Sequence, residues 1–222
     1  MPANMSFCLT GGRAVFLDTR QNRYFRLGSQ PEATFRALVA RGGEPDLDVG
    51  PLVRLGVLQA VADEGCRLNP AAAPAPTRSL VEDGRAVAPP DAGLTLEVVS
   101  AVVMSWASLK CLSLASVVER HRAMRQRRRI PDRGAQPRSR AGDIFSISAS
   151  FNRTRRIVPI DTVCLLDSLA LHRVLVHRGQ CPLLVIGVRL NPFAAHCWVQ
   201  TDDIVLNDAV ERATTYTPIL VI

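Results

Sequence analysis

The segment from Asp161 to Asp208 constrains the fold more than any other part of the chain, because a helical pattern and several strand patterns follow one another within it. Asp161 and Thr162 are good N-cap residues, and apolar side chains follow them at helical spacing as far as Gly179, a natural helix stop. Three short runs rich in β-forming residues come next, at 183–190, 195–200 and 204–207. We therefore expect a helix followed by antiparallel strands.

Three residues of this segment can combine into a catalytic device. Cys164 is expected in the first turn of the helix, where unpaired N–H groups and the helix dipole favour a thiolate. If residues 201–203 form the turn between the last two strands, His196 lies directly opposite Asp208, with Cβ atoms roughly 5 Å apart. The spacing therefore predicts Cys164 as nucleophile, His196 as base and Asp208 as the group that orients the imidazole.

Each of these residues also has a simpler interpretation when it is taken alone. Cys164 is then a small core residue, His196 a structural histidine and Asp208 the end of a strand. A slip of one residue in the strand register would also turn Asp208 to the wrong face.

Length, charge and cysteine use limit the class of protein. The chain has 222 residues, of which 47% are hydrophobic, so it is long enough for one large or two small domains with real cores. Its net charge of +7 permits nucleic acid, an anionic membrane or an acidic peptide as partner and selects none of them. Six scattered cysteines without any C-x-x-C, and no secretory signal, indicate a reduced cytoplasmic protein without a disulfide framework or a metal site.

Residues 1–70 are predicted to form a compact first domain. Short strands are expected at 6–9, 14–18 and 23–27, and a helix should start at Ser29, with Glu32 completing a capping box. A second helix is expected at 47–55, followed by a hairpin at 56–68.

Residues 71–93 are rich in Pro, Ala and Gly, which predicts a linker. Residues 94–122 are apolar over a length that raises the question of a membrane span. Glu97, Lys110 and several serines favour one or two buried helices, broken near Ser108, instead of a span. The basic run 120–140 is expected to be a loosely ordered, solvated surface segment, or a strip that binds anions. It lacks the interleaved aromatic residues typical of nucleic-acid binding.

The motifs VCLLDSLAL, AHCWVQ and VLND resemble the C-terminal half of lasso-peptide biosynthesis B proteins, over about residues 90–222. The resemblance implies a transglutaminase-like, papain-related cysteine protease domain in which Cys164, His196 and Asp208 supply nucleophile, base and acid. Cys197 departs from the family pattern, which usually has a small apolar residue there. The implied function is a leader peptidase that frees the core of a precursor before a separate ATP-dependent cyclase closes the macrolactam. No intrinsic cofactor is implied, and any ATP requirement would belong to the cyclase.

The motifs AVFLDTRQNRYFRL and LVRLGVL resemble the small chaperones of pyrroloquinoline quinone assembly, which are winged-helix-like precursor-recognition domains. The resemblance implies that a leader peptide adds as an extra strand beside the third strand. The alternatives are ordinary strand residues or a DNA-binding winged helix, for which the second helix offers only Arg54 as a base-reading side chain. The predicted peptide-binding residues are Arg23, Tyr24, Phe25, Arg26 and Leu27.

The combined expectation is an α+β protein. A recognition domain spans 1–70, a linker spans 71–93, and a cysteine protease domain spans 94–222. Two rival functions remain open: an acyltransferase or transglutaminase that uses the same thiol, and a peptide-binding module without catalysis.

Overall fold

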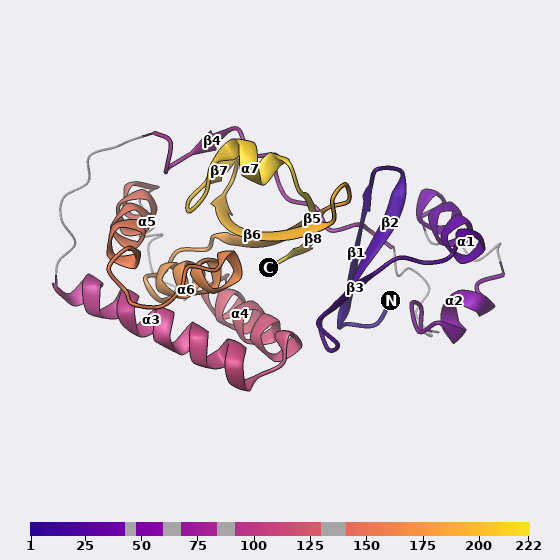
Figure 1. Ribbon diagram of the computed structural model, residues 1–222, viewed down its shortest axis with the longest axis horizontal. Coiled ribbons are helices and arrows are strands. Elements are labelled where there is room, and N and C mark those ends of the chain that lie inside the picture. Colours follow the sequence, from indigo (N-terminus) through magenta and orange to yellow (C-terminus); the bar gives the residue numbers. More distant parts are fainter. Residues whose placement is uncertain (43–47, 60–67, 84–91, 130–140) are drawn as a thin grey trace.

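The chain folds around two β-sheets, in a computed structural model that describes residues 1–42, 48–59, 68–83, 92–129 and 141–222. The first sheet has the strand order β1-β2-β3, and the second has the order β4-β7-β6-β5-β8. In Figure 1, the first sheet and helices α1 and α2 form one half of the molecule, and the remaining helices surround the second sheet. The predicted α+β class is confirmed.

The first sheet is an antiparallel meander of β1 (Met5–Thr10), β2 (Arg13–Asp18) and β3 (Arg23–Phe25). Gly11 and Gly12 make the first turn with φ of +53° and +73°, which glycine adopts without steric cost. Strand β3 ends at Phe25, although we expected a strand as far as Leu27. The prediction was too long because Gly28 already caps the following helix, so residues 26 and 27 form the connection.

Helix α1 (Ser29–Ala40) begins without a side-chain cap, so the predicted capping box is wrong. Glu32 is buried instead, and its carboxylate accepts hydrogen bonds from the Ala14 N–H at 3.0 Å and from the Arg13 guanidinium at 3.1 Å. These bonds tie the helix to β2, which explains why the carboxylate does not turn back to its own helix. Helix α2 (Gly50–Arg54) is shorter than predicted. Most of the hairpin expected at 56–68 lies outside the described residues.

In Figure 1, helices α3, α4, α5 and α6 lie on one side of the second sheet, and α6 packs directly on β5 and β6. The strands of this sheet run antiparallel except for β4, which is parallel to β7. Helix α7 lies on the opposite face, where Ala213 packs with Val185, Trp198 and Val205. The helices are α3 (Ala92–Cys111), α4 (Leu114–Arg129), α5 (Ala141–Arg155), α6 (Cys164–His177) and α7 (Val210–Thr214), and the strands are β4 (Arg78–Ser79), β5 (Leu183–Arg189), β6 (Ala194–Thr201), β7 (Ile204–Val205) and β8 (Thr217–Val221).

Helices α3 and α4 form over the apolar stretch 94–122, for which one or two helices were predicted. The break between them falls at Leu112 and Ser113, just after the predicted position. Among the described residues, α3 is the one helix long and apolar enough to cross a membrane, with a mean hydropathy of 1.5 and 28% of that window buried. Core helices of globular proteins meet the same criteria. Residues 120–129 continue α4, so this part of the basic run is helical and not loosely ordered.

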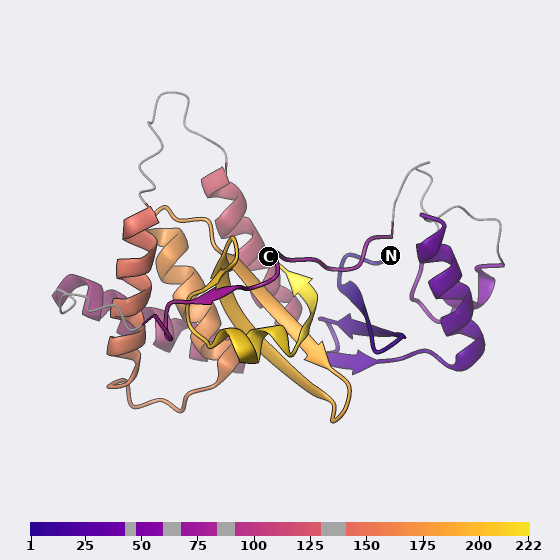
Figure 2. The ribbon, with the colours of Figure 1, turned by 90° about the horizontal axis from the view of Figure 1, so that it is seen from above.

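The two sheets share one apolar core. Cys8, Val15 and Leu17 of the first sheet are buried in the same cluster as Leu171 of α6 and Ile219 of β8. The segment that leads to β4 crosses from the first half to the second, as Figure 2 shows. This segment belongs to the predicted linker, and its backbone is bonded to both sheets: the Ala71 N–H donates to Phe7 O at 3.0 Å, and the Leu80 N–H donates to Val205 O at 2.9 Å.

Candidate active site

Cys164 is the first residue of helix α6, as the sequence predicted. The N-cap is Val163 in an extended conformation, and no side chain caps the helix, so the capping role expected of Asp161 and Thr162 is wrong. The reason lies in Arg155, a buried residue of α5. Its guanidinium donates to the carbonyl oxygens of Ile160 and Asp161 at 2.9 Å each and to the Asp167 carboxylate at 2.6 Å. These bonds fix the backbone in front of the nucleophile.

Helix α6 ends at the predicted place. Gly179 has a φ of +83°, and its N–H donates to Val176 O at 3.0 Å. The Gln180 N–H donates to Leu175 O at 2.9 Å. This pair of bonds is a Schellman motif, which satisfies carbonyl groups that the helix end leaves open.

The turn between β6 and β7 differs from the prediction by one residue. Thr201 pairs with Ile204, so only two residues form the turn, and Asp202 adopts a φ of +49°. The expected ladder position of Asp208 opposite His196 is therefore wrong. Strand β7 ends at Val205, and the bend that follows returns Asp208 to His196, where Asp208 Oδ2 and His196 Nε2 are hydrogen-bonded.

Beyond the end of β7, side chains instead of a neighbouring strand form hydrogen bonds with the backbone of β6. The Val199 N–H donates to Asn207 Oδ1 at 2.8 Å, and Ser168 Oγ donates to Cys197 O at 3.0 Å. Asn207 Nδ2 in turn donates to Ser168 Oγ at 3.0 Å. The Cys197 N–H lies on the same edge and donates to the Cys164 thiolate. The edge of β6 thus meets the start of α6 at the nucleophile.

The three predicted catalytic side chains lie together, and the pKa shifts of two of them are opposite in direction. A hydrogen bond with His196 lowers the pKa of Cys164, against burial, and N–H groups of Cys197 and Leu165 add to the lowering. Burial alone would lower the pKa of His196, but hydrogen bonds to Asp208 and Cys164 outweigh burial and raise it to about 9. Both shifts favour a protonated imidazole beside a thiolate over a neutral imidazole beside a thiol.

Burial works against the ionised form of Asp208, but the hydrogen bond to His196 lowers the pKa of Asp208. The Ala209 N–H donates to Asp208 Oδ1 at 2.8 Å, which lowers it further. Asp208 therefore stays a carboxylate facing Nε2. The other imidazole nitrogen, Nδ1, remains to exchange a proton with the thiol.

The His196 ring is enclosed by aromatic neighbours that the sequence did not single out. Tyr216 lies 5.1 Å and Trp198 lies 6.1 Å from it between ring centroids. Gly187 pairs with His196 across β5 and β6, and a Cβ there would come within 2.8 Å of both Trp198 and Tyr216. The lone glycine in the apolar run LLVIGVRL was the available signal for this close approach.

The other cysteines differ from Cys164. Burial raises the pKa of Cys8 to about 12, and it also raises the pKa of Cys197, whose side chain points away from His196 as predicted. The five cysteines within the described residues are all free. Within the same residues, no group of three or more His, Cys, Asp or Glu side chains is arranged to hold a metal ion.

Three further polar residues of α6 lie apart from the nucleophile. Asp167 bonds Arg155, and the exposed His177 pairs with Glu97 at 2.9 Å. His172 is fully buried, with its Nδ1 2.9 Å from Nδ1 of His121. We assign structural roles to all three.

The predicted peptide-binding residues lie on and after β3, which among the described strands pairs only with β2. Arg23 and Arg26 are exposed, and Leu27 is half-buried. Phe25 stacks on Phe16 at 5.3 Å, and Tyr24 contacts Phe193 of the β5–β6 loop at 5.5 Å. The two aromatic side chains of β3 therefore point to opposite faces of the first sheet.

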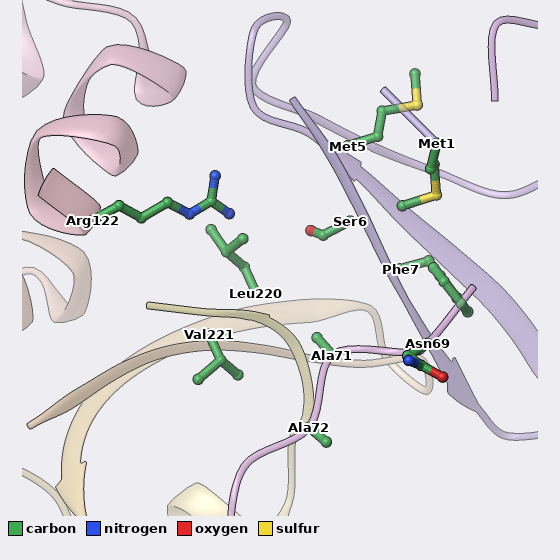
Figure 3. Close-up of a pocket in the computed structure, with 10 residues that line it drawn as sticks. All are labelled: Met1, Met5, Ser6, Phe7, Asn69, Ala71, Ala72, Arg122, Leu220 and Val221. Atoms are coloured by element: carbon green, nitrogen blue, oxygen red, sulfur yellow. The ribbon is translucent and has the colours of Figure 1, made fainter. Parts of the chain in front are cut away.

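Two cavities lie away from the Cys–His–Asp cluster. One, of about 350 Å³, opens between β1 and β8, and Figure 3 shows Arg122 of α4 extending toward it near Ser6 and Leu220. The other, of about 400 Å³, lies among α3, α4 and α6 and is lined by residues that include Met104 and Arg173. Neither cavity is lined by a residue of the cluster.

Comparison with known proteins defines the class. The transglutaminase-like superfamily model matches residues 106–221, which is more than half of the chain. The chain belongs to the transglutaminase-like superfamily. It is also 50% identical over 46 residues to the microcin J25-processing protein McjB of Escherichia coli. That match covers 21% of this chain and spans only 22% of the length of McjB. No solved structure matches the chain.

Proposed function

We propose that this chain is a cysteine peptidase that removes the leader from a lasso-peptide precursor. The observation that supports this most directly is the contact of Cys164, His196 and Asp208, which lowers the pKa of the thiol and raises the pKa of the imidazole. Membership of the transglutaminase-like superfamily and the partial match to a microcin-processing protein agree with it.

In the proposed reaction, the Cys164 thiolate attacks the scissile carbonyl carbon and forms a C–S bond, and the carbonyl oxygen becomes an oxyanion. The Cys164 N–H is a candidate donor to that oxyanion, because the first residue of a helix has no intrahelical acceptor for its N–H. The imidazolium of His196 then protonates the leaving nitrogen as the C–N bond breaks. The core peptide leaves as a free amine, and the leader remains as a thioester.

Hydrolysis completes the cycle. His196 accepts a proton from water as the water attacks the thioester, and the C–S bond breaks to release the leader carboxylate and regenerate the thiolate. Asp208 holds the imidazole through Nε2 throughout both steps.

We also propose that the leader adds along the outer edge of β3 and that a separate ATP-dependent cyclase uses the freed amine. The chain itself then needs no cofactor and no nucleic acid, and any ATP requirement belongs to the cyclase. A cytoplasmic location fits this scheme, because the nucleophile must stay reduced.

The test is cleavage of a precursor peptide encoded beside this chain, followed by mass spectrometry. Cys164→Ala should reduce cleavage by about 10³-fold or more while leader binding persists. Cys181→Ala removes an exposed thiol away from the site and is the matched control, with unchanged cleavage. Full cleavage by Cys164→Ala would refute the proposal.

Acyl transfer is the second candidate, and the superfamily to which the chain belongs favours its consideration. The same thioester would then be resolved by an amine instead of water. Added glycine amide separates the two outcomes: a peptidase releases the leader acid, whereas an acyltransferase releases the leader as its glycine amide conjugate.

A further inference from the structure

Strand β3 brings an aromatic side chain of the first sheet toward the second half of the molecule. Tyr24 pairs with Leu17 across β2 and β3, and directly opposed residues share a face. Leu17 is fully buried in the core that the two sheets share, and Tyr24 packs against that same core. Phe25 points the other way, onto Phe16. Of the three residues of β3, Tyr24 is thus the one whose side chain faces the second half of the molecule.

Tyr24 meets Phe193, with ring centroids 5.5 Å apart and an angle of 60° between the rings. Phe193 lies in the loop just ahead of β6, the strand that carries His196. Burial is the main cause that raises the pKa of Tyr24 to about 12, and the nearby Cys197 and Cys164 sulfurs add to it. Tyr24 is therefore close enough to Cys197 and Cys164 for their charges to act on its hydroxyl, and Phe193 packs on Tyr24.

The ring pair presents an apolar surface to solvent at this position. Phe193 is 51% exposed, and Tyr24 is half-buried next to it. Exposed aromatic rings at a site with few polar groups bind apolar side chains through buried area and ring contacts. This surface has no part in positioning His196, whose ring neighbours are Tyr216 and Trp198.

We propose that Tyr24 and Phe193 form a specificity subsite for an apolar side chain of the substrate, on the leader side of the scissile bond. The inference rests on the proposed peptidase function. A leader held along β3 runs beside Tyr24, and its chain must cross the ring pair to reach Cys164. Because the leader precedes the core, the residues that cross belong to the leader. Strand β3 would then both bind the leader and fix the length of chain between its anchored part and the bond that is cut.

Peptidyl chloromethyl ketones test the subsite without knowledge of the natural precursor. These reagents alkylate an active-site thiol after binding as substrates do. The probes are N-acetyl tripeptide chloromethyl ketones in which each position in turn is Gly, Leu, Phe or Asp, and the readout is the second-order rate of Cys164 alkylation by mass spectrometry. The intact chain should prefer Leu or Phe over Gly and Asp at one position by about tenfold.

Phe193→Ala and Tyr24→Ala should each reduce that preference to about twofold or less, since one ring of the pair is lost. Tyr24→Phe keeps the ring and should retain the preference. Arg20→Ala changes an exposed residue in the turn before β3, outside the predicted peptide-binding residues, and is the matched control, with the preference unchanged.

Iodoacetamide, which is too small to use the subsite, separates the two proposals. It should label Cys164 faster than Cys181 in the intact chain and at similar rates in all four variants. A preference for apolar probes that survives both Phe193→Ala and Tyr24→Ala would overturn the subsite. Labelling of Cys164 no faster than Cys181 would instead overturn the peptidase function. If Tyr24→Ala does not fold, Phe193→Ala alone decides, because Phe193 lies on an exposed loop.

Discussion

Cys164 and His196 act as one titrating unit, because each is the main or a major cause of the other's shifted pKa. The thiolate–imidazolium pair exists above the lowered pKa of Cys164 and below the pKa of about 9 of His196. Activity that depends on the pair should therefore rise as the pH passes the lowered pKa of Cys164 and fall above about pH 9.

The measurement is the pH profile of Cys164 alkylation by iodoacetamide, with free cysteine as the control. Free cysteine should gain reactivity around its thiol pKa of about 8.5, whereas Cys164, whose pKa is lowered, should gain reactivity at a lower pH. A profile for Cys164 that follows the free amino acid would contradict the ion pair.

Asp208→Asn tests the third member of the cluster. Asparagine keeps a hydrogen-bond acceptor at this position but removes the negative charge that helps to hold the pKa of His196 at about 9. We expect the alkaline limb of the pH–rate profile to move below pH 9 and the rate to fall by about tenfold or more. Asp167→Asn, on the same side of α6 as Arg155 but away from His196, is the control and should leave the alkaline limb in place.

Asn207 supports the site by hydrogen bonding alone. Its side chain accepts from the Val199 N–H and donates to Ser168 Oγ. Asn207→Ala leaves the partly buried Val199 N–H without that acceptor, so we expect a loss of about 1–3 kcal/mol in the free energy of unfolding. Chemical denaturation measures it. Ser168→Ala removes only the hydroxyl from the same series of hydrogen bonds. If Ser168→Ala lowered the free energy of unfolding more than Asn207→Ala does, the supporting role of Asn207 would be contradicted.

At the scale of elements, the local patterns in the sequence predicted the bounds of the helix that carries Cys164 better than the register of the strands that carry His196. The sequence correctly placed Cys164 in the first turn of α6 and the end of the helix at Gly179, although the predicted caps Asp161 and Thr162 are wrong. The predicted turn at 201–203 is one residue too long. Thr201, Asp202 and Asp203 are all residue types that favour turns, and the sequence does not show that Asp202 adopts a left-handed φ, which allows a two-residue turn. Asp208 nevertheless contacts His196, as predicted. Strand β7 ends before Asp208, so the shifted strand register does not determine where Asp208 lies.

The parts that the sequence did not reveal are contacts between distant segments. The sequence gives no sign that Arg155 differs from the other arginines, yet it is buried and orders the backbone before Cys164. Tyr24 was predicted to bind the leader at the edge of the first sheet, but the sequence did not indicate that its side chain faces the second half. Neither role has a local pattern, because each depends on packing between elements that are far apart in the chain.

Strand β5 depends on having no side chain at Gly187. A Cβ there would lie 2.8 Å from Trp198 and Tyr216, the two rings that flank His196. Gly187→Ala should therefore destabilise the fold by about 1–3 kcal/mol and lower activity, because the rings must shift. Thermal unfolding and cleavage rates measure both effects. Gly28→Ala is the control: its Cβ meets no heavy atom within 4 Å, and as an N-cap change it should cost less than about 1 kcal/mol.

At the scale of the whole molecule, the N-terminal half and the C-terminal half are joined by more than the segment between them. The first sheet has an apolar cluster on each face. Phe7, Phe16 and Leu38 pack in the cluster under α1, whereas Leu17 packs with the helices and strands of the second half. Backbone bonds from the segment between the halves reach both sheets. Leader binding at β3 and chemistry at Cys164 would thus occur on one connected framework.

Paired leucine substitutions test this connection. Leu17→Ala and Leu38→Ala are the same chemical change at buried positions, and each should cost about 2–5 kcal/mol of stability. Because Leu17 contributes to the shared core, its loss should increase hydrogen exchange in β1 and β2 and also in β8 and α6. The loss of Leu38, which lies in the cluster under α1, should increase exchange in the first half only. Hydrogen exchange with mass spectrometry measures both patterns, and exchange in β8 and α6 that stays unchanged in Leu17→Ala would show that the two halves unfold independently.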